Sequence, residues 1–273
     1  MIKSLSTAVD NPDRARIFVR DLAASARSID ANLLVTMLTA APMISSHIAP
    51  LGGLYLPEAE LRADAREDML SLRTGIGDDQ HVTIGGYYGD IAWLAHELRN
   101  SEAVVDLIVI GPASGWDVAW LRRNVIETLL LASGTPLLLL PEHKGLPEIS
   151  RATLGWKPSG EAVRAARDLM ALAEPGAHFD LVTVTHEGMA ETDRGNERCA
   201  MADYLTSHGF DVECHFTNDG GTTAEQLQRF ASVHKSDVLA IGAYAHSRVR
   251  EILLGGVTRS LVDDARIPLL MSR

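Results

Sequence analysis

The sequence predicts an α/β protein made of two tandem five-stranded parallel-sheet repeats, and three observations lead to this fold class. Short apolar runs rich in β-branched residues alternate with segments whose apolar residues recur three and four positions apart. The runs are continuously apolar, which is typical of strands buried on both faces. Several segments also recur, in the same order, in both halves of the chain. Strand alternating with helix favours a doubly wound parallel sheet, in each half.

The repeat is visible as paired segments at a nearly constant separation. Arg20-Asp-Leu-Ala recurs as Arg167-Asp-Leu-Met, and Leu33-Leu-Val-Thr recurs as Asp180-Leu-Val-Thr, each 147 residues later. Asp106-Leu-Ile-Val-Ile-Gly recurs as Asp237-Val-Leu-Ala-Ile-Gly after only 131 residues. The drop in separation places an insertion in the first half, at about 41–77, with a loop followed by a helix over 57–73.

The expected elements follow in order along each half. In the first half we expect strands at 3–9, 32–39, 81–84, 107–110 and 136–140. In the second half we expect them at 151–155, 179–185, 212–216, 238–241 and 268–272. Helices fill the intervals, as the patterns at 161–173 and 224–234 indicate. A Pro/Gly linker then divides the chain into a first domain, 1–143, and a second, 148–273.

Composition narrows the class of protein. The formal net charge is −11, from 36 acidic and 25 basic residues, which argues against binding nucleic acid or an anionic membrane surface. The start of the sequence has no secretory pattern, and Gly134 and Pro136 interrupt the longest apolar run. Cys199 and Cys214 form no metal motif and are expected to be thiols. We therefore expect a cytoplasmic protein.

One loop of the second half has the composition of a phosphate site. The apolar run ending at Ile241 stops at Gly242, passes through a basic segment, and restarts at Gly255-Gly256-Val257-Thr258. Glycine permits positive φ and close backbone approach, and a helix starting after Gly255 would direct unpaired N–H groups into the same space. A helix N-terminus of this kind binds anions.

With this loop, the chain resembles a tandem universal stress protein over nearly its whole length. The nucleotide-binding branch of that family carries Gly-x2-Gly-x9-Gly-[Ser/Thr] around the ATP phosphates. It also places an acidic residue after strand one, near the ribose, and backbone after strand two, near adenine. Gly242 and Gly255 match this motif, whereas Ala245 and Gly256 depart from it. The resemblance implies ATP or AMP as ligand, with or without Mg²⁺, and Val184 at the adenine position.

The two halves depart from the family pattern in complementary ways. Lys157 stands in the second half where the first half has Asp10, so a cation replaces the carboxylate and could neutralise phosphate. The first half keeps Asp10 but has Arg123 and Asn124 in place of the paired glycines, and these side chains are expected to fill the phosphate space. We assign the nucleotide to the second half. The expected nucleotide-binding residues are Trp156, Lys157, Pro158, Val184, Gly242, Ala245, His246, Arg248, Gly255, Gly256, Val257 and Thr258.

Other readings stay open at this point. The glycines could merely permit a tight connection, leaving a nucleotide-free interaction scaffold; a slow ATPase is a third possibility, although no general base is evident. We expect no catalytic residues and no metal site, because the histidines lack ligand spacing. The fifth strands, 136–140 and 268–272, are expected at sheet edges, pairing the halves as a pseudo-dimer and favouring self-association.

Overall fold

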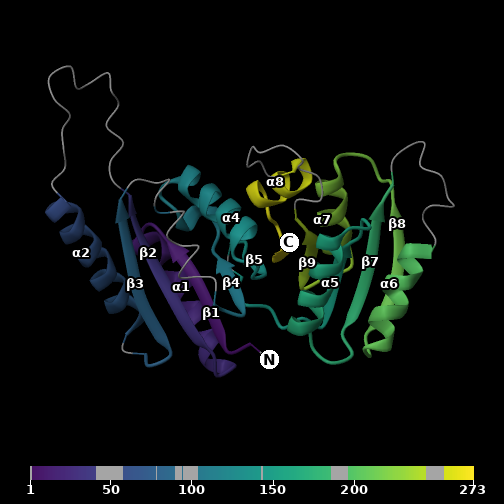
Figure 1. Cartoon of the computed structure of the whole chain (residues 1–273), viewed down its shortest axis with the longest axis horizontal. Coiled ribbons are helices and arrows are strands. Elements are labelled where there is room, and N and C mark those ends of the chain that lie inside the picture. The colour runs from purple at the N-terminus through teal and green to yellow at the C-terminus, as the bar shows by residue number, and fades with distance from the viewer. Residues whose placement is uncertain are drawn as a thin grey trace, which may run out of the picture. The chain divides into compact units, whose positions relative to one another are not determined.

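A computed structural model describes residues 2–40, 58–77, 79–89, 94, 104–142, 144–185, 196–243 and 255–273. Within it the chain forms two compact units, 2–133 and 134–273. Figure 1 shows that each unit is a set of strands running side by side with helices packed against them. The predicted α/β class is therefore confirmed.

The first unit follows the expected alternation of strand and helix. Its strands are β1 (Ser4–Val9), β2 (Asn32–Ala40), β3 (Val82–Gly89) and β4 (Leu107–Ile110). Its helices are α1 (Pro12–Ser28), α2 (Glu58–Ile76) and α4 (Ala119–Ala132), with a short 3₁₀ turn, η1 (Ala113–Gly115), before α4. The strands lie in the order β3-β2-β1-β4, and the pairs β3–β2, β2–β1 and β1–β4 are parallel.

The described part of the second unit contains six strands. They are β5 (Leu137–Leu139), β6 (Arg151–Gly155), β7 (His178–Val184), β8 (Asp211–Thr217), β9 (Val238–Gly242) and β10 (Leu269–Ser272). The helices are α5 (Gly160–Leu172), α6 (Asn196–Ser207), α7 (Thr223–Val233) and α8 (Gly256–Asp263). The strand order is β5-β10-β9-β6-β7-β8, parallel except that β5 pairs antiparallel with β10. The two predicted fifth strands thus pair with each other, and β5 falls within this unit.

Local sequence explains where the helices begin. Asn11 caps α1, since its side-chain oxygen accepts hydrogen bonds from the backbone N–H groups of Asp13 and Arg14. Thr222 and Glu225 form a reciprocal capping box at the start of α7. The central strands supply most of the buried aliphatic residues, such as the fully buried β4 run Leu107–Ile110, and this apolar burial forms the core.

Two aspartates, one in each unit, make equivalent hydrogen bonds and so confirm the repeat at atomic level. Asp106 Oδ2 accepts from the backbone N–H groups of Lys3 and Ser4, at 2.8 and 2.9 Å. Asp237 Oδ2 accepts in the same way from Ser150 and Arg151, both at 2.9 Å. Each aspartate thereby fixes the start of the neighbouring strand. Ser4 and Arg151 are equivalent positions of the two repeats.

The pairing of the strands corrects the alignment of the two repeats at their second strands. Ser4 pairs with Asn32 across β1 and β2, whereas Arg151 pairs with His178 across β6 and β7. Asn32 therefore matches His178, a separation of 146 rather than 147. The shared Leu-Val-Thr triplet had shifted the alignment by one residue. Under the corrected register, the buried Asp180 occupies the position of Leu34.

The predicted insertion at 41–77 contains an element that the fold itself requires. Its helix is α2, which connects β2 to β3 and packs on both strands and on α1. In the second unit, α6 occupies the same place between β7 and β8. The additional length lies in the longer α2 and in residues 41–57, which fall outside the described residues. Among the described helices, none combines the length and apolarity that crossing a membrane requires.

Candidate functional site

The predicted nucleotide residues lie at the carboxyl ends of neighbouring strands in the second unit. Gly155, Val184 and Gly242 are the last residues of β6, β7 and β9, and β6 lies between the other two strands. Gly256 begins α8, the helix that follows β9. Parallel α/β sheets bind ligands at this end, where strands give way to loops and helices. The fold therefore assembles the expected edge from segments up to a hundred residues apart.

Gly242 is explained by packing rather than by backbone conformation. A Cβ atom built on Gly242 would lie 2.5 Å from the backbone nitrogen of Ala162 and 2.5 Å from the carbonyl carbon of Glu161. Both atoms belong to the first turn of α5. Gly242 is also absent from the described glycines with positive φ, so of the two roles considered for glycine here, the structure supports close backbone approach. Its glycine lets β9 approach α5 closely.

Neither backbone conformation nor packing against described residues requires glycine at Gly255 and Gly256. Gly255 is the N-cap of α8 with φ −56° and ψ 152°, and Gly256 has no positive φ either, so an L-residue could adopt the backbone at both. A Cβ atom at either position would meet no described heavy atom within 4 Å. No side chain among the described residues caps α8, in contrast to α1, α5 and α7. No described side chain therefore competes for the backbone N–H groups of its first turn.

The next two residues of α8 differ in exposure. Val257 is 37% exposed, whereas Thr258 is only 5% exposed and lies on the packed face of the helix. The structure thus gives Thr258 a place in the core of the unit.

The loop after β6 combines a buried tryptophan with exposed neighbours. Trp156 is 6% exposed, and its backbone N–H donates to Val182 O at 2.8 Å. Its indole Nε1 is buried and has no hydrogen-bond partner among the described residues. Lys157 and Pro158 are exposed, and Ser159 then caps α5. Trp156 is therefore packed into the unit with one polar atom unsatisfied, which is uncommon for a buried indole.

Three of the predicted site residues, Ala245, His246 and Arg248, lie outside the described residues, and their part in the site stays a prediction.

Comparison with known proteins bears on the fold. No family model matches the chain, and no curated protein matches it. A universal stress protein from Archaeoglobus fulgidus aligns with a TM-score of 0.66 at 14% identity, over 99% of this chain and 96% of that one. A putative universal stress protein from Pseudomonas aeruginosa UCBPP-PA14 aligns with a TM-score of 0.52 at 15% identity, over 99% and 93%. A functionally unknown protein from P. aeruginosa PAO1 gives 0.52 at 16% identity, over 99% and 92%.

The chain has the fold of a tandem universal stress protein.

Within this universal stress protein fold, the first repeat fills the corresponding edge with its own carboxylate. Asp10, directly after β1, accepts hydrogen bonds from the backbone N–H groups of Asp117 and Val118, at 2.9 and 2.8 Å. Val118 is the N-cap of α4. Burial raises the pKa of Asp10 above its ordinary value, while the two N–H groups oppose that rise. A protein anion therefore occupies the position where a phosphate would meet this helix.

Two arginines support the closed edge of the first universal stress protein repeat. Arg14 Nη1 donates to Trp116 O at 3.3 Å, and its guanidinium pairs with Asp117 at 3.2 Å. Arg122 is buried, and its Nε and Nη2 lie 3.4 and 3.3 Å from Gly111 O. Trp116 itself is 3% exposed. The hydrogen bonds of the two guanidinium groups and the buried indole thus hold the loop before α4 in a packed conformation.

The residues expected to fill that space, Arg123 and Asn124, were the wrong ones. The helix α4 already begins at Ala119, so both residues lie inside it, and Asn124 Nδ2 donates to Trp120 O within the same helix. The cause is the connection after the fourth strand. It runs over 111–118 in the first repeat and over 243–255 in the second, so positions matched by counting do not match in space.

Proposed function

We propose that this protein belongs to the universal stress proteins and binds ATP or AMP in its second unit, acting as a cytoplasmic nucleotide-sensing or protective regulator without catalytic turnover. The observation that carries the proposal is the contrast between two helix starts. In the first unit, Asp10 accepts from the backbone N–H groups before α4. In the second unit, α8 begins with two glycines, and no side chain in the described part of the chain caps it.

The physical argument rests on what a phosphate requires. The N-terminus of a helix carries about half a positive charge and several unpaired N–H donors, which favour a bound anion. Gly255 and Gly256 add no side chain in front of those donors, and no described atom lies within 4 Å of where a Cβ would stand. Lys157 replaces the carboxylate of Asp10, which removes a repulsive charge and adds an attractive one. The second unit thus favours a polyanionic ligand.

The proposed contacts follow the order of the sheet. The phosphates bind at Gly255, Gly256 and the first turn of α8, with His246 and Arg248 adding positive charge. The adenine lies against the end of β7 at Val184. Mg²⁺, where present, accompanies the phosphates of ATP.

Thermal denaturation with added nucleotide tests the proposal. A ligand that binds only the folded state stabilises it by about 2.7 kcal/mol at a concentration one hundred times its Kd. We expect ATP or AMP at millimolar concentration, with and without Mg²⁺, to raise the Tm, and inorganic phosphate alone to raise it less. An unchanged Tm under all these conditions would favour a nucleotide-free interaction scaffold with the same fold.

A charge at the N-cap of α8 separates binding from stability. Aspartate is a better N-cap than glycine by a few tenths of a kcal/mol, so Gly255→Asp should leave the ligand-free Tm unchanged or slightly raised. The same carboxylate blocks the phosphates, and the nucleotide-induced rise in Tm should disappear. Ala119→Asp, at the exposed first residue of α4, adds an equal charge to the other unit and should preserve that rise.

Phosphate release tests the absence of turnover. We expect release by the wild-type protein to equal the buffer background. Release above background that is lost in Gly255→Asp would replace the regulator with a slow ATPase.

A further inference from the structure

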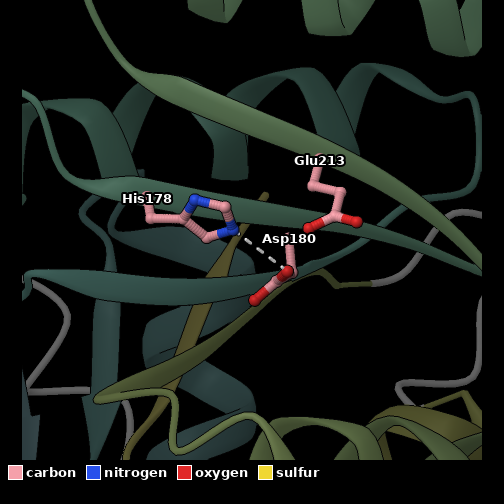
Figure 2. Close-up of side chains that lie close together, drawn as sticks. All are labelled: His178, Asp180 and Glu213. Atoms are coloured by element: carbon pink, nitrogen blue, oxygen red, sulfur yellow. Dashed lines mark hydrogen bonds and ion pairs between the residues drawn. The ribbon is translucent and has the colours of Figure 1, made fainter.

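A second polar cluster lies at the opposite, amino-terminal end of the strands in the second unit. His178 and Asp180 lie on β7, and Glu213 lies on β8 directly beside Asp180 in the pairing register. One nitrogen or oxygen atom from each of these three side chains can be chosen so that all lie within 4.8 Å of one another (Figure 2). Alternation along the strands puts His215 on the same face. Four side chains able to bind a metal therefore converge on one face of the sheet.

The distances centre on one carboxylate oxygen. His178 Nε2 lies 3.3 Å from Asp180 Oδ1, and His215 Nε2 lies 2.9 Å from the same oxygen. His215 Nε2 is also 3.8 Å from Glu213 Oε2. Ligands about 2.0–2.2 Å from a tetrahedral zinc ion are separated by about 3.3–3.6 Å. His178, Asp180 and Glu213 are the three whose ligand atoms all lie within 4.8 Å of one another, so zinc binding draws these three side chains closer together.

His178 has a second carboxylate on its other ring nitrogen. Its Nδ1 lies 2.7 Å from Asp211 Oδ2, while its Nε2 lies 3.3 Å from Asp180 Oδ1. Carboxylate–histidine–metal chains, in which the carboxylate orients the imidazole ring, are common in zinc sites. Asp211 is therefore placed to orient His178 toward an ion at Nε2.

The local charge also favours a divalent cation. Asp180, Asp211 and Glu213 contribute three carboxylates, and Arg151 contributes one guanidinium, bonded to both oxygens of Asp180 at 2.8 and 2.9 Å. These three carboxylates outnumber the single guanidinium by two. Asp180 is fully buried, where uncompensated charge is costly. A divalent ion neutralises the excess.

The fold does not require this cluster, because the first unit lacks it. The equivalent positions, obtained from the pairing registers, are Asn32, Leu34, Thr83 and Gly85. None of these residues provides a carboxylate or an imidazole. The same sheet is thus built with neutral residues, and the cost of burying Asp180 is specific to the second unit.

We propose that the second unit binds one Zn²⁺ ion through His178 Nε2, Asp180 Oδ1 and the Glu213 carboxylate, with His215 Nε2 hydrogen-bonded to Asp180. Asp211 orients His178 through its Nδ1–H, and Arg151 holds the second oxygen of Asp180. The Arg151 Nη2 contact to Oδ1 lengthens on binding. Glu213 is 62% exposed, so the ion enters from its side. This site departs from the sequence-based expectation of no metal, and it is separate from the nucleotide edge.

Zinc titration of the full-length protein tests the site. The protein is stripped with a chelator, Zn²⁺ is titrated at pH 7.5 against a chromophoric competitor, and bound metal is counted by elemental analysis. We expect one Zn²⁺ per chain. Glu213→Gln, whose side chain is largely exposed, and His178→Gln should each weaken binding by about tenfold or more, and Asp211→Asn by about tenfold. His208→Gln, an exposed histidine of the same unit, should bind as the wild type does.

The alternatives give different results. Wild-type protein that binds no Zn²⁺ would show that the hydrogen bonds and ion pairs of the cluster suffice without a metal, and the proposal would be wrong. Binding that is unchanged in both Glu213→Gln and His178→Gln would place the ion elsewhere and would equally overturn it. Circular dichroism of each variant establishes that the fold is retained, and Glu213→Gln keeps the test decisive if His178→Gln unfolds.

Discussion

The carboxylate of Asp10 accepts a hydrogen bond of 2.8 Å from the backbone N–H of Val118, the residue that caps α4. A second bond, 2.9 Å from Asp117 N, completes a two-donor site for an anion. Phosphate groups of ligands bind helix starts through the same kind of donor. The first unit therefore supplies from its own chain the negative charge that, in the second unit, we propose a nucleotide supplies.

Removing this carboxylate should destabilise the first unit. Asp10→Ala leaves two backbone N–H groups without their acceptor, and each unsatisfied buried donor costs about 1–3 kcal/mol. Because water can reach part of the site, we expect a net loss of about 2 kcal/mol in the free energy of unfolding. Urea denaturation measures it.

Asp21→Ala is the matched control. Asp21 lies on α1, is largely exposed and pairs with the neighbouring Arg20 at 3.3 Å. Exposed pairs contribute about 0–1 kcal/mol, so its removal should change stability little. Equal losses in the free energy of unfolding for the two substitutions would mean that the Asp10 hydrogen bonds stabilise the unit no more than an exposed ion pair does.

Alanine should cost far more stability at Gly242 than at Gly255. Gly242→Ala places a methyl group 2.5 Å from the backbone of α5, and backbone cannot move aside as a flexible side chain can. We expect a loss of about 2 kcal/mol or more. Gly255→Ala meets no described atom within 4 Å and should cost less than about 1 kcal/mol, from the poorer N-cap alone. Thermal denaturation of both variants compares them, and similar Tm values would refute the packing explanation of Gly242.

Acid should weaken the start of β1 through Asp106. The backbone N–H of Lys3, with further help from Ser4, lowers the pKa of Asp106 below its ordinary value of 3.8. A carboxylate with a lowered folded pKa contributes stability that is present above 3.8 and is lost as pH falls through the folded value. Below pH 4, urea midpoints should therefore fall less steeply for Asp106→Asn than for the wild type. Parallel slopes would contradict this linkage.

The sequence predicted the elements far better than the contacts between them. The strands 107–110 and 151–155 were predicted at their observed bounds, because buried parallel strands have a simple apolar pattern. Asp10 was noticed, but its partners lie more than a hundred residues away and are backbone atoms, which leave no trace in composition. For Gly242, the neighbouring turn of α5 becomes visible only in three dimensions.

The polar cluster of His178, Asp180, Glu213 and His215 likewise depends on a contact between strands that the sequence does not reveal. His178-x-Asp180 and Glu213-x-His215 each have the spacing of residues on one face of a strand, so the signal was present in the sequence. It could not be recognised as one group until the register of β7 on β8 was known. A shift of one residue in that register would have sent one pair to the other face.

Breaking the Arg151–Asp180 ion pair should show how much of the second unit depends on buried charge. Asp180 is fully buried and is bonded by Arg151 at 2.8 and 2.9 Å. In chelator, Arg151→Met leaves the carboxylate without its cation, and we expect a loss of about 3 kcal/mol in urea denaturation.

The double variant Arg151→Met/Asp180→Leu should recover most of that loss, since an apolar replacement of both partners leaves no unpaired charge. Leucine suits the position, because Leu34 occupies it in the first unit. A double-mutant cycle isolates the coupling between the two side chains. If the double variant were no more stable than Arg151→Met alone, the histidines around Asp180 would have to be the groups that hold the cluster together. Its charge could then not be replaced by apolar packing.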